Sequence, residues 1–333
     1  MKLTFKDIIS ATNGIVRFKK KDFELELYRF TKKQERFFYK THPAFKGESF
    51  FDGYFGTNCK TGAGITLDFI SDCSALKINF SKVEYAKLQK PRKHFLDLYV
   101  DKKFAKAFEV ESQINYFSSG EKTRFTLYFP SYAKPIISSI ELENATIFEP
   151  QKKQIEILFL GDSITQGAFA INPSNSYVMR VARELDIGIL NQGNSGFVYD
   201  KGSIEKVCEP KIIVTAYGIN DINRKNIQAI EKDTSKFLAL LKKVYKNSKI
   251  VSILPLWTMQ NSSEQALHLQ KRNCLKSVYE KYSNYILDGY DIIPHEAKYF
   301  DDEVHPNDEG FAYYGEFLTK ELKKILSTLK EIV

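Results

Sequence analysis

The stretch of sequence that decides the fold reads IEILFLGDSITQG and covers residues 155–167. Its first six residues are apolar except for Glu156, and such a run is typical of a strand buried on both faces of a parallel sheet. A Gly-Asp-Ser turn follows directly, at the carboxyl end of the predicted strand. Ligands of open α/β sheets bind at that edge. A serine there can act as a nucleophile when a base and an oxyanion pocket lie within reach.

Strand and helix patterns alternate through the rest of the chain. Further strands are predicted at residues 187–190, 211–216, 249–254 and 285–287. Helical patterns cover about residues 176–184, 225–247, 262–283 and 308–330, with Ser176 as the cap of the first helix. This alternation predicts an α/β domain with a doubly wound parallel sheet and right-handed crossovers.

The first half of the chain follows a two-residue rhythm instead. Apolar residues alternate with polar ones in predicted strands at 65–69, 76–80, 94–100, 104–110, 124–129 and 136–147. Short strands at this spacing, without a long helical pattern between them, favour an all-β sandwich of the jelly-roll kind. Residues 50–56 read FFDGYFG. We interpret these aromatic side chains as sandwich core rather than as a face toward a ligand or toward the second domain.

A polar segment, EPQKKQ at residues 149–154, separates the two patterns. The length of 333 residues is also long for one domain, so we predict a β-sandwich domain at residues 1–150 and an α/β domain at residues 151–333. Residues 1–150 carry 25 Lys and Arg against 18 Asp and Glu, whereas residues 151–333 carry 24 against 23. The basic half shows no nucleic-acid-binding motif, so we expect no nucleic-acid partner.

Composition excludes several other classes of protein. No stretch approaches the ~18 uninterrupted apolar residues of a membrane span, so no membrane association is expected. The first residues, MKLTFKDIIS, lack the pattern of a signal peptide, which predicts a cytoplasmic location. The four cysteines, at positions 59, 73, 208 and 274, show neither CxxC nor metal-ligand spacing. We therefore expect free thiols, no metal site and no cofactor.

Four short motifs follow one another along the second half of the chain. They read GDS at residues 161–163, NQGNSG at 191–196, GIND at 218–221 and DEVH at 302–305. Each alone also fits a turn or a helix cap. Together and in this order, the set resembles the SGNH (GDSL) hydrolase superfamily. The resemblance implies a flavodoxin-like sheet, and with the β half in front it extends to two-domain carbohydrate esterases.

The resemblance implies a serine nucleophile, and the chemistry explains the residue types. A serine hydroxyl attacks an acyl carbon efficiently only when a neighbouring base accepts its proton, so Ser163 requires His305. Asp302, three residues before the histidine, can hold the other ring nitrogen and stabilise the imidazolium. These three residues are the predicted catalytic set.

The tetrahedral oxyanion requires donors that are already in place. We expect the backbone N–H groups of Ser163 and Gly193 and the side-chain amide of Asn220 to supply them. Asp162 and Asp221 are assigned to supporting hydrogen bonds rather than to proton transfer. A phosphate-binding loop is disfavoured because GDSITQG lacks the Lys-Ser/Thr ending, and no GxSxG elbow occurs.

These residues predict a serine esterase that hydrolyses small acyl esters, with an acetylated saccharide as the expected substrate. An acyltransferase that uses the same serine, and a glycan-binding protein without turnover, are the alternatives. The sandwich can serve either as a carbohydrate-binding domain or as a structural one. The sequence leaves open the acyl length, the alcohol or sugar, and the oligomeric state.

Overall fold

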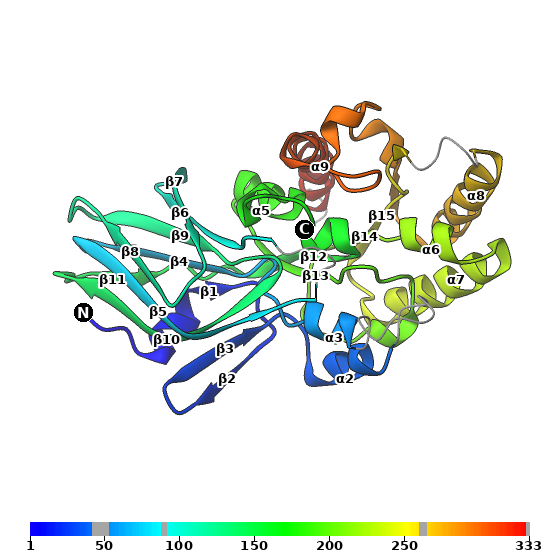
Figure 1. The fold of residues 1–333 in the computed structure, drawn as a ribbon. Coiled ribbons are helices and arrows are strands. Elements are labelled where there is room, and N and C mark those ends of the chain that lie inside the picture. Colours follow the sequence, from blue (N-terminus) through cyan, green and yellow to red (C-terminus); the bar gives the residue numbers. More distant parts are fainter. Residues whose placement is uncertain (42–52, 88–91, 260–264, 331–333) are drawn as a thin grey trace.

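The structure is a computed structural model that describes residues 1–41, 53–87, 92–259 and 265–330. Figure 1 shows two parts side by side: a β-rich part built from most of the first 150 residues, and a part in which helices surround a central sheet. The predicted fold class is confirmed, because two antiparallel sheets precede a parallel one. Within the described residues, no helix is long and apolar enough to cross a membrane.

Five parallel strands form the central sheet of the second part, in the order β13-β12-β14-β15-β16. Their bounds are β12 Ile155–Gly161, β13 Gly188–Gly193, β14 Ile212–Ala216, β15 Lys249–Ile253 and β16 Tyr285–Leu287. Successive side chains point to opposite faces, so Phe159 enters one core while Leu158 and Leu160 enter the other. Burial on both faces explains why β12 reads as a nearly continuous apolar run.

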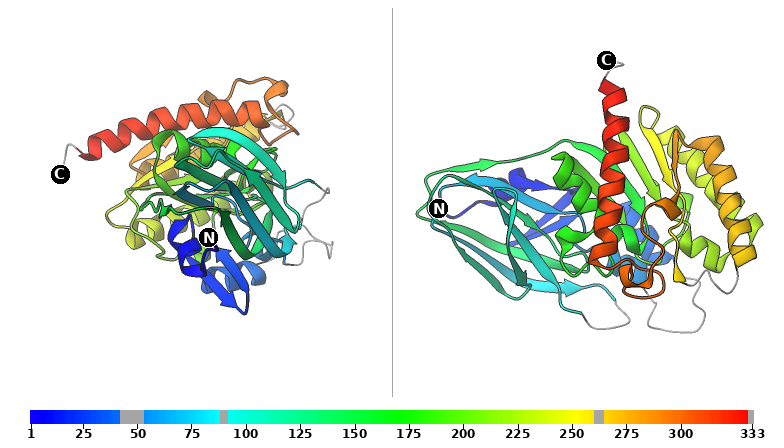
Figure 2. Two further views of the ribbon diagram at one scale, coloured as in Figure 1. Left: turned by 90° about the vertical axis from the view of Figure 1, so that its left-hand side faces the viewer. Right: turned by 90° about the horizontal axis from the view of Figure 1, so that it is seen from above.

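Helices cover both faces of the parallel sheet. Their bounds are α4 Ser163–Gln166, α5 Tyr177–Leu185, α6 Ile219–Arg224, α7 Ile227–Val244, α8 Gln265–Tyr282 and α9 Asp308–Lys330, with single 3₁₀ turns at Pro173–Asn175, Lys201–Ser203, Gly289–Asp291 and Ala297–Tyr299. α5 and α9 pack on the face of Phe159, and α7 and α8 on the face of Leu158. Figure 2 shows α9 along the outside of this part, with its C-terminal end projecting beyond the rest. Ser176 stands at the N-cap of α5, but its hydroxyl donates to the Pro173 carbonyl instead of capping the helix.

Two antiparallel sheets form the first part. One has the order β1-β4-β9-β6-β7, with β11 paired to β4, and the other has the order β2-β3-β10-β5-β8. The bounds are β1 Thr12–Asn13, β2 Arg17–Lys21, β3 Glu24–Tyr28, β4 Thr66–Ser71, β5 Ala75–Tyr85, β6 Phe95–Val100, β7 Lys103–Glu109, β8 Gln113–Phe117, β9 Thr123–Tyr128, β10 Ala133–Glu143 and β11 Phe148–Pro150. Phe69, Ile78 and Ile137 belong to the core of this part. The sequence patterns miss β2, which reads RFKKK and is largely exposed, because it shows no apolar alternation.

Three helices in the first half of the chain are also absent from the prediction: α1 (Phe5–Ala11), α2 (Lys32–Lys40) and α3 (Tyr54–Asn58). α2 and α3 lie beneath the α/β part in Figure 1. Phe55, in α3, shares one core with Leu158 of the parallel sheet. The prediction that Phe55 fills the sandwich core is therefore wrong. Residues 50–52 of the same aromatic segment lie outside the described residues.

A buried arginine ties the segment around α2 and α3 to the parallel sheet. Arg29 is 0% exposed. Its guanidinium donates to four backbone carbonyls, those of Asn58 at 3.0 Å, Thr61 at 3.1 Å, Asn191 at 2.9 Å and Gly193 at 2.7 Å. Burial lowers the pKa of Arg29 to about 10, so the side chain stays charged at neutral pH. We call Arg29 and these four carbonyls the carbonyl junction.

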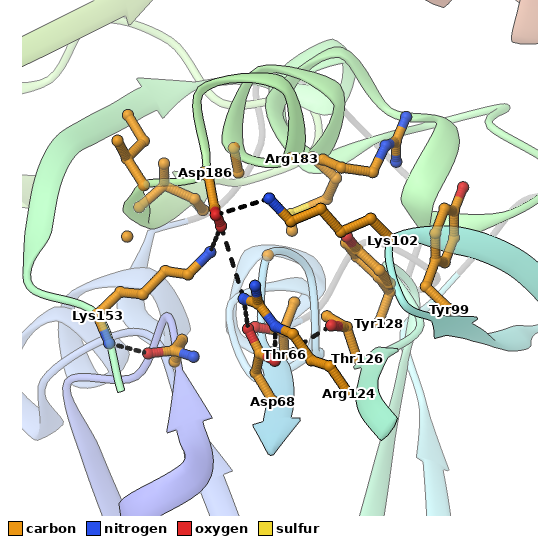
Figure 3. A pocket seen from close by; sticks show the side chains of 17 residues that line it. Thr66, Asp68, Tyr99, Lys102, Arg124, Thr126, Tyr128, Lys153, Arg183 and Asp186 are labelled. Carbon is orange, nitrogen blue, oxygen red and sulfur yellow. Dashed lines mark hydrogen bonds and ion pairs between the residues drawn. The ribbon is translucent and has the colours of Figure 1, made fainter. Parts of the chain in front are cut away.

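A second junction between the two parts is ionic and partly exposed (Figure 3). Asp186 ends α5 and pairs with Lys102, in the turn between β6 and β7, at 3.0 Å and with Lys153. Arg124 approaches the same carboxylate at 3.6 Å and forms a bidentate pair with buried Asp68 at 2.8 and 2.6 Å. These five residues line a cleft of about 40 Å³, and we call them the ionic junction.

Candidate active site

The serine of the GDS motif lies at the sharp turn between β12 and α4. Asp162 is the N-cap of α4 and accepts the backbone N–H of Ile164 at 3.1 Å. Gly161 has no room for a side chain, because a Cβ atom there would stand 1.9 Å from the Thr165 hydroxyl oxygen. The turn therefore places Ser163 in the first position of the helix, where a backbone N–H has no partner within the helix.

Ser163, His305 and Asp302 come together although they are far apart in the chain. The Ser163 hydroxyl lies 2.8 Å from His305 Nε2. His305 Nδ1 lies 2.8 and 3.0 Å from the two carboxylate oxygens of Asp302. Asp302 also accepts the backbone N–H groups of Val304 and His305, at 2.8 and 2.7 Å, which fixes its orientation. The structure thus brings together the three residues predicted for nucleophilic attack and proton transfer.

The charge of Asp302 determines which nitrogen of His305 carries the proton. Burial raises the pKa of Asp302, but the hydrogen bonds and the charge of His305 outweigh it and bring the value to about 2. The carboxylate is therefore ionised at neutral pH, and it favours the imidazole tautomer with hydrogen on Nδ1. Nε2 is then free to accept the proton of Ser163.

An aromatic ring lies against the histidine, and a residue from the sandwich lies against that ring; the sequence patterns predict neither contact. Phe169 stacks on His305 with ring centres 4.8 Å apart and an interplanar angle of 19°. The Arg92 guanidinium lies 3.5 Å from the centre of the Phe169 ring. Phe169 has a φ of 69°, which a bulky residue adopts only when its surroundings enforce it. No local signal marks these contacts, because they join residues that are far apart in the sequence.

Asn220 and the two aspartates assigned to support lie near the serine turn. The Asn220 amide donates to Asp162 at 3.3 Å and to the Phe197 carbonyl at 3.2 Å. Burial raises the pKa of Asp162 to about 7, so this carboxyl group is partly protonated at neutral pH. Asp221 is buried as well, and it pairs with Lys225 at 2.9 Å. Both aspartates make hydrogen bonds of the supporting kind, and their contribution to turnover stays a prediction.

Gly193 does not offer its N–H group to a substrate, contrary to the sequence prediction. It is the last residue of β13, it is buried, and its N–H donates to the Asn191 side-chain oxygen at 2.8 Å. A Cβ atom at this position would stand 2.4 Å from the backbone nitrogen of Gln166. Glycine is thus required here because β13 packs closely against α4.

Gly196, three residues later in the same motif, has an N–H group that remains available. It lies in a half-buried turn with a φ of 73°, and among the described residues its N–H has no acceptor. Hydrogen bonds from the two preceding residues, Asn194 and Ser195, hold this turn beside the serine. Asn194 N–H donates to the Gly161 carbonyl at 2.9 Å, and Ser195 N–H donates to the Gln166 side chain at 2.8 Å.

The cysteines lie outside this cluster. All four are free thiols, as their spacing predicts, and Cys59 and Cys73 are buried. Burial raises the pKa of the Cys59 thiol to about 12, so it is a poor nucleophile at neutral pH. Across the described ranges, no three His, Cys, Asp or Glu side chains gather closely enough to hold a metal ion.

Comparison with known families identifies the same region. Residues 159–313 match the sequence model of the GDSL-like lipase/acylhydrolase family. This range includes the serine turn, the NQGNSG and GIND motifs, and the DEVH motif with its histidine. Among curated proteins, none matches the chain.

Several solved structures are similar over both domains. The salicylyl-acyltransferase SsfX3 from a tetracycline biosynthetic pathway is 14% identical, with a TM-score of 0.75 over 94% of each chain. A family two carbohydrate esterase from Clostridium thermocellum in complex with cellohexaose is 14% identical, with a TM-score of 0.60 over 80% of this chain and 93% of its own. The acetyl xylan esterase Est2A from the rumen bacterium Butyrivibrio proteoclasticus is 17% identical, with a TM-score of 0.58 over 80% and 91%. At these identities the similarity shows a shared fold.

Proposed function

The chain belongs, through residues 159–313, to the GDSL-like lipase/acylhydrolase family, and on that basis we propose that it is a serine esterase. The observation that carries the proposal is the chain of contacts from Ser163 through His305 to Asp302, with 2.8 Å at each link. A serine hydroxyl held this close to an oriented imidazole can lose its proton as it attacks. The proposed substrates are small acyl esters.

The steps follow from the positions of these groups. His305 Nε2 accepts the hydroxyl proton while Ser163 Oγ bonds to the acyl carbon. The bond from that carbon to the alcohol oxygen then breaks, and His305 returns the proton to the departing alcohol. Water enters and repeats the sequence on the acyl-serine, which releases the acid. Asp302 accepts the hydrogen bond from His305 Nδ1 throughout the reaction and stabilises the imidazolium.

The oxyanion of each tetrahedral intermediate needs preplaced donors. We assign this role to the N–H groups of Ser163 and Gly196, so Gly196 replaces Gly193 in the original prediction. The Asn220 amide is the third donor. Its hydrogen bonds to Asp162 and Phe197, at 3.3 and 3.2 Å, are long, so the amide is held in place and can still be shared with an oxyanion.

An acetylated saccharide is the substrate that we propose first. Two of the similar structures are, by their names, a carbohydrate esterase in complex with cellohexaose and an acetyl xylan esterase. Both share the fold over 80% of this chain, so the similarity extends beyond residues 151–333 into the first half. The low identity leaves the sugar and the position of its ester to experiment.

Hydrolysis of p-nitrophenyl esters from acetate to octanoate, by the wild type beside Ser163→Ala, tests the esterase proposal. We expect turnover that requires Ser163 and falls beyond acetate. A fluorophosphonate probe should label the wild type and leave a folded Ser163→Ala variant unlabelled. A well-folded wild type that hydrolyses none of these esters would count against the proposal.

Two neighbouring aspartates offer a matched test of the proposed triad. Asp302→Asn should lower kcat by about 10⁴, as in other serine hydrolases, because the amide favours the wrong tautomer of His305. Asp301→Asn removes the same charge one residue earlier, where the side chain is 51% exposed, and should leave kcat within about twofold. Equal losses in both variants would contradict the role of Asp302.

Acyl transfer to an alcohol is the second candidate function. It is favoured by the similarity to SsfX3, which is named as an acyltransferase and covers 94% of this chain. The same serine site serves both reactions, and they differ in whether water or an alcohol deacylates the enzyme. Product analysis with candidate alcohols present distinguishes them, since transfer in excess of hydrolysis would replace the esterase assignment.

A further inference from the structure

A groove of about 420 Å³ opens beside the turn that contains Gly196. This volume is within the range of small-molecule sites, roughly 300–1,000 Å³. Gly196, Phe197 and Tyr199 line it from the turn after β13, and Arg224 and Lys225 line it from the end of α6. α7 supplies a further wall, including Lys232 and Lys236, and Thr41 and Phe55 line the groove from the first half of the chain. The groove is thus built mainly by the α/β domain, around one of its predicted motifs, and is completed by two residues of the first half of the chain.

The groove adjoins the proposed catalytic serine through a short series of hydrogen bonds. The Phe197 carbonyl accepts the Asn220 amide, and that amide also donates to Asp162, the residue before Ser163. On the groove side, Arg224 donates to the Gly196 carbonyl at 2.7 Å. A ligand in the groove would therefore lie next to the proposed oxyanion donors.

The charges that line the groove are mostly positive. Five cationic side chains face two carboxylates, Asp200 and Asp233. Lys225 forms ion pairs with Asp233, at 3.0 Å, and with Asp221, at 2.9 Å. Lys201, Lys232 and Lys236 are exposed, and among the described residues none of them forms an ion pair. Because residues 151–333 as a whole carry only one net positive charge, this groove concentrates charge that the rest of the domain balances.

We propose that this groove binds an anionic group of the substrate, a carboxylate or a phosphate on the saccharide that carries the ester. The inference rests on the proposed esterase function and specifies its substrate class. Lys232 and Lys236 are one helical turn apart on α7, so both ammonium groups can approach a single anion. In this arrangement the anionic group of the ligand lies in the groove, and the rest of the ligand extends along Gly196 so that its ester lies at Ser163. Lysine contacts of this kind affect substrate binding more than the chemical step.

Kinetics with three acetylated sugars test the inference. We would measure acetate release from mono-O-acetylated glucose, glucuronic acid and glucose 6-phosphate. An exposed charge contact contributes up to about fivefold in affinity, so two lysines predict a KM about tenfold lower for a charged sugar than for glucose. The carboxylate and phosphate arms identify which anion the groove prefers.

Two double variants of the same helix separate the groove from the overall charge. Lys232→Gln/Lys236→Gln should raise KM for the preferred charged sugar about tenfold and leave kcat within about twofold. Lys242→Gln/Lys243→Gln removes the same charge from α7 outside the groove and should change neither value. p-Nitrophenyl acetate, which is neutral, should be hydrolysed equally by all three proteins. Equal KM values for the three sugars, or equal responses of the two double variants, would overturn the inference.

A binding measurement makes the inference independent of turnover. Calorimetry with Ser163→Ala should show that glucuronate or glucose 6-phosphate binds about tenfold more tightly than glucose, and that Lys232→Gln/Lys236→Gln abolishes the difference. Preferential binding without ester turnover in the wild type would reject the esterase proposal and retain the anion site. Ester turnover with equal affinity for all three sugars would retain the esterase proposal and reject the anion site.

Discussion

The two junctions between the sandwich and the α/β domain hold the same pair of domains by different means. The carbonyl junction places one fully buried cation among neutral backbone oxygens, whereas the ionic junction pairs cations with carboxylates in a partly exposed cleft. Water and salt can replace most of the interactions in the second junction. They cannot reach the first, where each carbonyl left without its donor stays unsatisfied. The junction with fewer formal ion pairs is therefore expected to contribute more stability.

Removing residues 1–150 should have the largest effect, because it removes the carbonyl junction completely. The deletion would also expose part of the core around Leu158 and Leu190, because Phe38 and Phe55 belong to that core. We expect residues 151–333 alone to lack a cooperative thermal transition. A protease site inserted at residues 151–154 is the control, since the cut halves should stay associated and active. A soluble, active 151–333 fragment would show that the sandwich is a detachable module.

Arg29→Met should have the next largest effect. Four buried carbonyls lose their donor, and each such loss costs about 1–3 kcal/mol, so the free energy of unfolding should fall by about 4 kcal/mol or more. Urea unfolding measures the change. Arg36→Met, an exposed position on α2, is the matched control and should change it by less than about 0.5 kcal/mol. Similar values for the two variants would mean that the carbonyl junction contributes little.

Arg124→Met should have an intermediate effect, because it removes the cation that pairs with Asp68, the one buried carboxylate of the ionic junction. Asp68 is 2% exposed and would retain only the Thr126 hydroxyl, at 3.2 Å, as a side-chain donor. We expect unfolding free energy to fall by about 2–3 kcal/mol at pH 7. Adding Asp68→Asn should recover part of this loss, since the buried charge is then removed as well. If the double variant recovers no stability, the loss in Arg124→Met does not come from the unpaired charge of Asp68.

Asp186→Asn should have the smallest effect, less than about 1 kcal/mol, because its carboxylate is 43% exposed. Burial raises the pKa of Asp186, but Lys153, Lys102 and Arg124 lower it by more. A folded pKa below the unfolded value of about 4 means that the contribution is present above pH 4. It is lost as the pH falls through the folded pKa. The wild type and the variant should thus differ at pH 6, converge in acid, and converge at high salt.

The comparison of the junctions also explains what the sequence patterns reveal and what they miss. The strands of the parallel sheet are predicted within a few residues, because burial on both faces requires apolar runs such as residues 155–160. α2 and α3 are missed because they have nine and five residues, too few for a convincing helical period. Arg29 is missed because nothing in the neighbouring sequence marks it as buried. One of its hydrogen-bond acceptors, the Asn191 carbonyl, lies 162 residues later in the chain.

The sequence by itself determined the parallel sheet, since local periodicity predicts its strands, and it determined the order of the four motifs. The resemblance of these motifs to a known family implied the three residues that meet at the serine. Only the tertiary structure decided that, among the described residues, the N–H of Gly193 has an acceptor and that of Gly196 has none. It also decided that Phe169 stacks on His305 with Arg92 against the Phe169 ring, and that the first domain completes the core of the second. These features depend on which backbone groups are already satisfied by distant partners. Such pairing is a property of the packed chain, and neighbouring residues do not encode it.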